Sequence, residues 1–433
     1  MLLKIEKLLF YLFLFLIPFQ IRIFLNNNGE WNSIFIYLGD LIFLAVLVLW
    51  IINNKIPSHK LAIKNKKNIF LFLFLLIAFI SVFVSSGTKI SAFRFLKLLE
   101  FAILFIYIFH KKEAKILHIL FYSGILQGIL AITQFIKQGS INIKFIEAGV
   151  FSPDSPGVAN FILNGDRILR SYGSFSHPNV LAGFLLMTIF AFYAIWQKKP
   201  INILRCIGFA VLVFAMFLTF SRTAIVVFGV MSLIFFLFEF FKLRKLEHTE
   251  QRLIDGKKLI KLFLLFIVSC LLAVMILFPC IKARFFTISL GEQAVDLRIF
   301  YNKMAIEMIK EKPILGIGVG NFVNYSQNYS AYLRAASKMI DVPRQDSGQL
   351  VPSWIYQPVH NIYLLIASEI GILGVLAFLG FVAIVLLDEI KKKSAFLLLT
   401  ISFLILALLD HYFWTLQSGG IMFWLALALT QKE

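Results

Sequence analysis

The sequence predicts an all-α integral membrane protein with about 12 transmembrane helices and a large extracytoplasmic loop that contains an amphipathic helix. Of its 433 residues, 60% are hydrophobic, whereas a soluble domain is about half apolar. The apolar residues form long runs, and a helix needs about 20 mostly apolar residues to cross the hydrocarbon core of a bilayer. Lys and Arg gather between alternate runs, which is typical of the cytoplasmic loops of a multi-pass protein.

Twelve apolar runs are the predicted membrane spans. They cover residues 5–25, 34–52, 69–85, 93–109, 116–137, 179–196, 203–220, 222–241, 259–279, 360–387, 395–409 and 415–430. The first run has the basic start and apolar stretch of a signal peptide but lacks a small-residue cleavage site, so we expect it to stay as the first helix. Several runs are short, which predicts tilted or partly buried helices.

The formal net charge of +19 follows the predicted topology. Basic residues concentrate in loops such as "NNKIPSHKLAIKNKKN" and "KLRKLEHTEQRLIDGKK", and the short loops on the other side contain very few. The positive-inside rule therefore predicts that both termini are cytoplasmic. Because the charge is explained by topology, nucleic-acid binding is not predicted. The three cysteines suggest neither a disulfide framework nor a metal site.

Two outside loops are long, at about 138–178 and 280–358. Within the second, "EQAVDLRIFYNKMAIEMIKE" has the spacing of an amphipathic helix, which Pro313 would end. We expect this helix to lie on the outer membrane–water boundary. Its predicted apolar face consists of Leu297, Phe300, Met304 and Met308.

Arg222 is the single charge in "AMFLTFSRTAIVVFGVM". An arginine near the centre of a membrane helix costs roughly 2.5–3.5 kcal/mol on insertion scales, so it normally has a partner. Either Ser221–Thr223 is a tight outside turn from which Arg222 reaches lipid phosphates, or Arg222 faces a cavity and binds an anion. Arg298, at the start of the amphipathic helix, is either a solvated residue or a second arm of a pyrophosphate clamp.

His360 precedes the tenth run, in "PVHNIYLLIASEIGILG". A histidine there is either a cap or interface residue, or a group for proton transfer, for which an unperturbed pKa near 6.5 is suitable. Asn361 adds a hydrogen-bonding group. Glu369 is nine residues further on and therefore roughly on the opposite side of the helix, so we do not pair it with His360.

Three further stretches contain polar residues at predicted helix ends. In "SYGSFSHPNVLAGFLL", a structural role is favoured for His177 and Asn179, since Pro178 suits the first turn of a helix and Ser176 or His177 would cap it. Arg170 upstream is a candidate for phosphate contact, as is Arg167. "KPILGIGVGNF" is a poor match to a nucleotide-binding turn, and we expect a flexible glycine-rich turn packed against the membrane face. In "DHYFWTLQSGG", caps and an interfacial aromatic belt are favoured.

Taken in order, these stretches resemble the O-antigen ligase and polymerase superfamily of bacterial membrane glycosyltransferases. The matching pieces are "GSFSHPNVLAGFLL", "LTFSRTAIV", an arginine ahead of "NKMAIEMIKEKPILGIGVGNF", and "HNIYLLIASEIGILG". The resemblance covers about residues 170–385. We expect one polytopic domain over 1–433, with 203–385 as the ligase-related core that includes the outside loop 280–358.

The resemblance implies a GT-C-like enzyme in the bacterial cytoplasmic membrane, with its site on the outer face. It would move a glycan from a polyprenyl diphosphate carrier, such as undecaprenyl diphosphate, to a lipid- or protein-linked acceptor hydroxyl in lipopolysaccharide or polysaccharide biosynthesis. It also implies a catalytic role for His360 and diphosphate binding by Arg222 and Arg298. Possible further substrate contacts are Arg170, His177, Asn179 and Asn361. No cofactor or metal is implied.

Two alternatives remain open from the sequence. A polysaccharide repeat polymerase belongs to the same superfamily and would use the same donor. A transporter or flippase of lipid-linked sugars would also suit twelve spans, but it usually needs ionisable residues near the midplane and broken helices in matching halves. Here the notable charges cluster toward the outside, which favours an enzyme.

Overall fold

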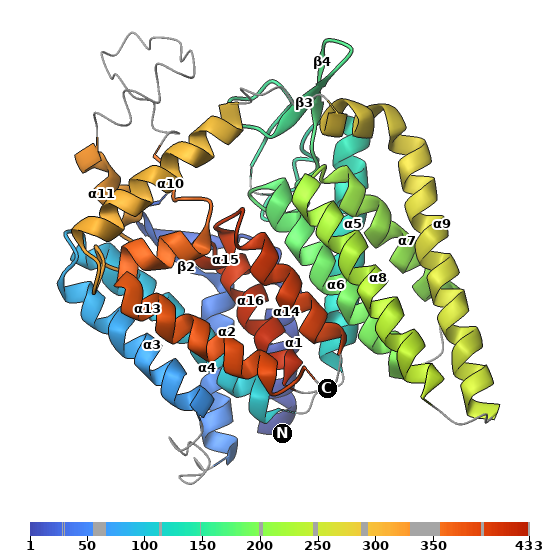
Figure 1. The fold of residues 1–433 in the computed structure, drawn as a ribbon, viewed down its shortest axis with the longest axis horizontal. Helices are drawn as coiled ribbons and strands as arrows, with labels where there is room; N and C mark the ends of the chain where they lie inside the picture. The colour runs from blue at the N-terminus through green and yellow to red at the C-terminus, as the bar shows by residue number, and fades with distance from the viewer. Residues whose placement is uncertain are drawn as a thin grey trace.

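The computed structural model describes residues 1–27, 29, 31–54, 66–111, 115–147, 149–198, 202–245, 250–286, 293–329, 356–390 and 394–431. These residues are mostly helical, as Figure 1 shows, so the predicted all-α class is confirmed in its main feature. Two small antiparallel hairpins accompany the helices, β1 (Arg22–Asn26) with β2 (Ile34–Tyr37), and β3 (Asn160–Leu163) with β4 (Asp166–Leu169). The sequence analysis predicted neither hairpin.

A helix overlaps each of the twelve predicted spans. These helices are α1 (Leu2–Phe15), α2 (Leu38–Asn54), α3 (Lys66–Phe83), α4 (Thr88–His110), α5 (Lys115–Lys137), α6 (Pro178–Lys198), α7 (Ile203–Leu218), α8 (Arg222–Arg244), α9 (Glu250–Phe286), α13 (Ile362–Leu387), α14 (Ala395–Leu406) and α16 (Gln417–Thr430). Between them lie α10 (Gln293–Glu311), α11 (Phe322–Ser326), the 3₁₀ turn η1 (Gln327–Tyr329) and α15 (Tyr412–Thr415).

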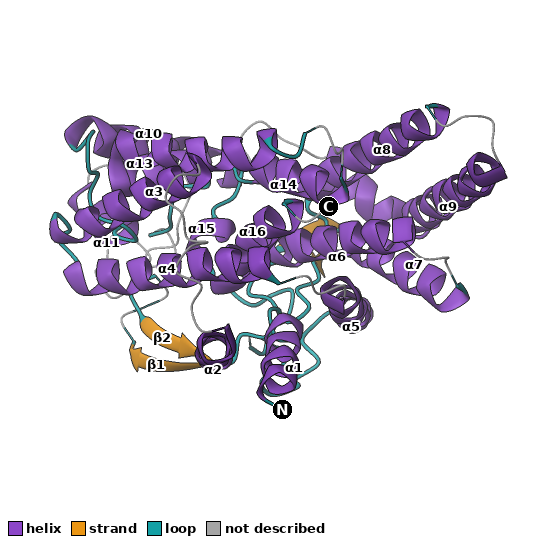
Figure 2. Ribbon diagram, turned by 90° about the horizontal axis from the view of Figure 1, so that it is seen from below, coloured by secondary structure: helices purple, strands orange, loops and turns teal. Residues whose placement is uncertain are grey.

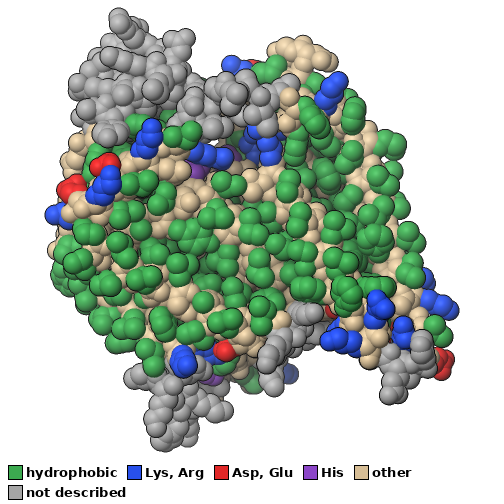
Figure 3. Space-filling view, in the orientation of Figure 1, with side chains coloured by type: hydrophobic (Ala, Val, Ile, Leu, Met, Phe, Trp, Pro, Cys, Tyr) green, Lys and Arg blue, Asp and Glu red, His purple; other side chains and the backbone are tan. Residues whose placement is uncertain are grey.

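Six of the described helices are long and apolar enough to cross a membrane, and four shorter helices are also apolar. Hydrophobic side chains cover the middle of the molecule, and Lys and Arg gather at its two ends, as Figure 3 shows. The start of α1 and the end of α16 lie at the same end of the bundle (Figure 1). The chain is thus a multi-pass membrane protein, and the full count of twelve crossings stays a prediction.

The first two predicted spans need correction. The helix that was expected over 5–25 ends at Phe15, and the one expected over 34–52 begins only at Leu38, after β2. Pro18 explains the first difference, because the residue before a proline is disfavoured in the helical conformation. The following stretch, with aromatic and β-branched residues on both sides of an Asn-rich segment, forms the β1–β2 hairpin.

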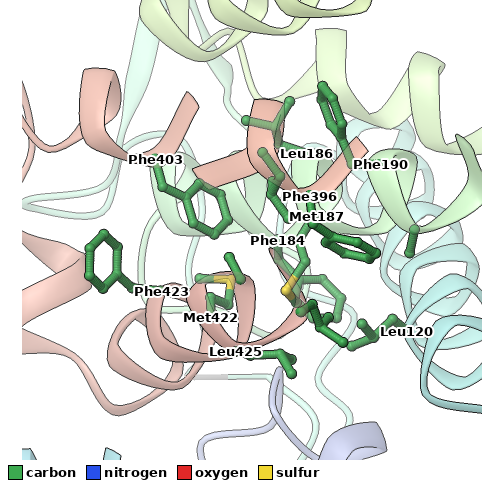
Figure 4. Close-up of a cluster of buried hydrophobic side chains, with 14 of the residues drawn as sticks. Leu120, Phe184, Leu186, Met187, Phe190, Phe396, Phe403, Met422, Phe423 and Leu425 are labelled. Atoms are coloured by element: carbon green, nitrogen blue, oxygen red, sulfur yellow. The ribbon is translucent and has the colours of Figure 1, made fainter. Parts of the chain in front are cut away.

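The helix α6 forms the centre of the bundle. Its residues from Val180 to Trp196 are buried almost throughout, because α5, α7, α8, α14 and α16 pack around it. Figure 4 shows the middle of this core, where side chains from α5, α6, α14 and α16 meet. In Figure 2, α7, α8 and α9 extend to one side of the molecule, and the β1–β2 hairpin lies beside α2 and α4.

The amphipathic helix predicted in the second outside loop is α10. Met304 and Met308 on its apolar face are fully buried, and Leu297 and Phe300 are partly buried in the same cluster. This face packs on α13. The predicted face therefore contacts protein, and the position of α10 relative to a membrane stays a prediction.

A glycine-rich loop after α10 packs into a bend of α13. Gly371 has φ 75° and ψ 176°, which interrupts the helix. The freed carbonyl groups of Ser368 and Glu369 accept hydrogen bonds from the backbone N–H groups of Ile317 (2.9 Å) and Gly318 (2.8 Å). The predicted glycine-rich turn is thus bound to the protein interior, and it links the outside loop to the tenth span.

Gly371→Ala is expected to destabilise the protein. The conformation of Gly371 is essentially restricted to glycine and costs about 1–3 kcal/mol for other residues. An added Cβ would also overlap the backbone carbonyl of Ile314. Thermal unfolding of detergent-purified protein should show a clearly lower Tm.

Gly229→Ala in α8 is the matched control, because a Cβ added there would meet no other atom within 4 Å. It should keep or raise the Tm, since alanine favours a helix by about 1 kcal/mol over glycine. Equal melting of both variants would contradict the proposed tight fit at Gly371.

Candidate active site

Several chain segments that are far apart in sequence meet at one end of the bundle. They are the starts of α6, α8 and α13, the start of α10, and the link between α14 and α15. This end carries α10 and the β3–β4 hairpin in Figure 1 and lies opposite the chain termini. In Figure 3, Lys or Arg side chains and a histidine appear in a hollow at this end. The predicted site residues lie on these segments.

A hydrogen-bonded network holds three of these segments together. Asn179 donates from Nδ2 to Oδ2 of Asp410 (2.7 Å), and its Oδ1 accepts a hydrogen bond from Nη2 of Arg170 (2.7 Å). Arg170 also donates from Nε to the carbonyl of Thr219 (2.9 Å), in the turn before α8. Nδ1 of His177 accepts from the backbone N–H of Asn179 (3.1 Å), which is the capping role that the sequence favoured.

His360 is held by ring packing. Its ring meets the ring of His411 edge to face, with centroids 4.8 Å apart, and stacks near Tyr301 at 6.0 Å. Tyr301 is buried on α10, so the helix of the outside loop helps to fix the histidine. Rings at these distances and angles attract each other, which restricts the orientation of the imidazole.

The site keeps its histidines neutral. Burial lowers the pKa of His360, and Arg298 lowers it further, whereas Asp410 acts in the opposite direction. Burial, together with neighbouring positive charges, lowers the pKa of His177 and of His411 to about 3. A neutral imidazole can accept a proton at physiological pH, so His360 has the protonation state that a general base needs.

Asp410 stays ionised although it is buried. Burial raises its pKa, but the nearby histidines and the hydrogen bond from Asn179 outweigh this and leave the pKa below its usual value. The backbone N–H of His411 also donates to its Oδ1 (2.8 Å). Hydrogen bonds to a carboxylate favour the charged form. Asp410 thus supplies a fixed negative charge beside the histidines.

Arginines surround this carboxylate. Arg298 lies close enough to lower the pKa of all three histidines. Burial and the charge of Arg284 lower the pKa of Arg170 to about 9, and Arg222 contributes in the same direction. The positive charges of these arginines exceed the negative charge of Asp410, and the N-terminal end of α8 adds the positive end of a helix dipole. Such an excess favours an anionic ligand.

A small cavity joins these elements. It is lined by residues from the starts of α6 and α8, from α10 and from the α14–α15 link, including Asn179, Ser221, Thr223, Arg298, Asp410 and Tyr412. Arg298 therefore reaches the turn that carries Arg222, although about 75 residues separate them in the chain. Arg298 is the arginine among the lining residues of this cavity, which we call the arginine-lined cavity. His360 is within electrostatic reach of Arg298.

Residues 207–379 match the family model described as O-antigen ligase. Residues 207–379 are thus similar to the O-antigen ligase family. The resemblance that the sequence predicted is confirmed over this stretch, which contains Arg222, Arg298 and His360. The match indicates a membrane enzyme of ligase or polymerase type that uses lipid-linked glycans. No curated protein matches the chain.

Within residues 207–379, Asn361 has a structural role. Its side chain accepts a hydrogen bond from the backbone N–H of Leu364 (3.1 Å) and caps α13. Arg167 lies outside this stretch and is exposed on β4, with Asp154 at 4.0 Å. Glu369 is buried and accepts a hydrogen bond from Nε1 of Trp414 (2.8 Å), in agreement with the decision not to pair it with His360.

Two contributors were missed from the sequence, and two others were underrated. Arg284 and Tyr301 were not considered, and Asp410 with His411 was assigned only to caps and an aromatic belt. A signal for Arg284 existed, because a basic residue at the outer end of the ninth span departs from the positive-inside pattern. Nothing in the sequence distinguished Tyr301 from the other apolar residues of α10.

Proposed function

We propose that this protein moves a glycan from a polyprenyl diphosphate carrier to an acceptor hydroxyl, as an O-antigen ligase does, on the outer face of the cytoplasmic membrane. The supporting observation is that Arg298 lies within electrostatic reach of His360 and shares a cavity with the turn that carries Arg222. One place thereby offers both a neutral base and the positive charge that a diphosphate needs.

The reaction follows from these groups. The acceptor hydroxyl gives its proton to His360 while its oxygen forms a bond to the anomeric carbon of the glycan. The bond between that carbon and the phosphate oxygen breaks, and the polyprenyl diphosphate leaves with the electron pair. Arg222 and Arg298 stabilise the negative charge that grows on the leaving group. His360 then releases its proton to solvent.

Arg170, His177 and Asn179 act in this proposal mainly as positioning residues. Their hydrogen bonds run among the start of α6, the α7–α8 turn and Asp410, so they hold the turn of Arg222 and the link of His411 in place. Arg284 adds positive charge beside Arg170. The charge of Asp410 would stabilise the imidazolium that His360 becomes during the transfer.

The proposed topology has twelve crossings with both termini in the cytoplasm. The loop-rich end with α10 and β3–β4 then faces the outside, where both lipid-linked substrates would present their sugars. The hydrophobic band in Figure 3 and the common end of the two termini in Figure 1 support this arrangement.

The purified protein in lipid vesicles tests the proposal. With a polyprenyl diphosphate-linked glycan and an acceptor lipid, it should produce glycosylated acceptor, and it should do so in the presence of EDTA because arginines supply the positive charge. A ladder of growing glycan on the carrier would instead identify a polymerase. Movement of the carrier across the bilayer without transfer would identify a flippase and overturn the proposal.

A further inference from the structure

A second pocket lies beside the histidines. It extends over two adjoining hollows between the β1–β2 hairpin, α4, the glycine-rich loop and the α15–α16 corner. The residues that line both hollows are Trp31, Phe35, Tyr37, Arg94, Thr415 and Leu416. None of them belongs to the arginine-lined cavity or to residues 207–379. We call it the hairpin pocket.

The segment from Asp410 to Leu416 separates the two sites. Asp410 and Tyr412 line the arginine-lined cavity, whereas Thr415 and Leu416 line the hairpin pocket. Between them, the ring of His411 meets the ring of Trp31 at 5.3 Å. Since His411 also packs against His360, the hairpin pocket begins one side chain away from the proposed base.

Arg94 fixes the shape of the hairpin pocket. It donates from Nη1 to the carbonyl of Thr415 (2.9 Å) and from Nη2 to the carbonyl of Trp31 (3.2 Å). It thereby ties the tip of the hairpin to the end of α15. A side chain at Gly320 would overlap Arg94, so the glycine-rich loop leaves room for this link. The position of Trp31 is thus built into the fold.

The cations of the hairpin pocket lie near carboxylates or aromatic rings. Arg22 lies over the rings of Phe24 and Phe35, and Glu147 lines the same hollow. Lys97 binds the carboxylates of Asp40 and Glu100. Arg94 lies within electrostatic reach of Glu369, which lines the same pocket. A diphosphate would find little uncompensated positive charge here. Aromatic rings beside polar groups instead suit a sugar, whose C–H faces stack on rings while its hydroxyls form hydrogen bonds.

We propose that the hairpin pocket binds the sugar of the acceptor and stacks it on Trp31, which places the acceptor hydroxyl next to His360. This inference rests on the proposed function. The transfer needs two glycans at one base, and the arginine-lined cavity provides for the diphosphate of only one. The hairpin pocket approaches the base from the other side of the Asp410–Leu416 segment.

Sugar binding is tested without turnover. The probe is the oligosaccharide released by mild acid from the cell-surface glycolipid of the source bacterium, observed by saturation-transfer NMR with purified protein. We expect signals from its ring protons with the wild type and with Trp50→Ala, and roughly 5- to 10-fold weaker binding with Trp31→Ala. Trp50 is a matched control, because it is a partly buried tryptophan that packs on Tyr107 and His110 away from both sites. Wild-type protein that does not bind the probe, or folded Trp31→Ala with unchanged binding, would overturn the inference.

If Trp31→Ala does not fold, hydroxyl-radical footprinting of the wild-type protein still tests sugar binding at Trp31. The oligosaccharide should slow the hydroxyl-radical oxidation of Trp31 and leave that of Trp50 unchanged. Equal oxidation of Trp31 with and without the probe would contradict sugar binding at this place. Because neither measurement involves transfer, a failure of the proposed function would leave these results unaffected.

Kinetics then identify which substrate the pocket takes. Trp31→Ala should raise the half-saturating concentration of the acceptor about 5- to 10-fold and leave that of the donor unchanged. An increase for the donor alone would assign the pocket to the donor glycan and would refute the acceptor assignment.

Discussion

Folded His360→Ala is expected to transfer glycan about 10²–10⁴-fold more slowly than the wild type, which is the usual contribution of general-base assistance. The reason is positional and electrostatic. His360 packs against His411 and Tyr301, and its lowered pKa keeps it able to accept a proton. Single-turnover transfer with saturating donor and acceptor measures the effect on the chemical step.

His360→Gln separates proton transfer from packing. Glutamine fills part of the space and forms hydrogen bonds but cannot act as a base near neutral pH, so it should be nearly as slow as alanine. His110→Ala is the control, since His110 lies at the termini end of α4 beside Trp50. Near-normal transfer by a folded His360→Ala would remove His360 from the mechanism and leave it a helix-start residue.

The pH dependence gives this prediction a second readout. The base must be neutral, so transfer should fall as the pH drops through the pKa of His360. Because that pKa is lowered from 6.5, the acid limb of the profile, in which the transfer rate falls with falling pH, should lie below pH 6.5. Near neutral pH the transfer rate should not change with pH. His360 replacements should abolish this limb.

The sequence predicted the positions of the main site residues but not how they are held. His360, Arg222 and Arg298 stood out because a polar residue in or beside an apolar run is energetically unfavourable unless it has a partner or a function. The arrangement of their helices is a tertiary feature, since α10 packs on α13, α14 packs on α8, and Asn179 binds Asp410. No spacing rule relates residues that are so far apart in the chain.

Hydropathy also misplaced the first two spans for a physical reason. A window that averages apolar character cannot distinguish a helix from a hairpin of Ile, Phe and Tyr, so the signal of Pro18 was outweighed. The missed hairpin also matters for the proposed sites, because the loop of the β1–β2 hairpin places Trp31 against His411. A sequence analysis without this hairpin had no way to propose the second pocket.

Both pockets together explain why charge is distributed unevenly at this end of the molecule. A diphosphate needs positive charge, and Arg170, Arg222, Arg284 and Arg298 act electrostatically within the cluster that contains Asp410. A neutral sugar needs polar groups and rings, and in the hairpin pocket Lys97 is paired with carboxylates while Arg22 lies over aromatic rings. If the same excess charge lined both pockets, the acceptor site would compete for the donor diphosphate.

Arg298→Ala and Arg222→Ala are each expected to slow transfer by about 10²–10³-fold, the usual cost of removing one group that stabilises negative charge in the transition state. Arg222→Lys keeps the charge but loses the planar fork that binds two phosphate oxygens, so it should remain impaired. Transfer measured at limiting donor is the appropriate assay, because loss of ground-state binding then adds to the effect. Arg244→Ala is a matched control, since Arg244 is exposed at the opposite end of the same helix as Arg222.

Arg298→Ala should also change the pH profile, and this readout distinguishes a role beside His360 from a general structural role. Arg298 lowers the pKa of His360, so its removal should raise that pKa and move the acid limb of transfer to higher pH. Arg244→Ala should leave the limb in place. If Arg298→Ala and Arg222→Ala both retain full transfer at limiting donor, the arginines do not bind the diphosphate. If transfer falls but the acid limb does not move, Arg298 acts on the donor without reaching His360, and the shared site is wrong.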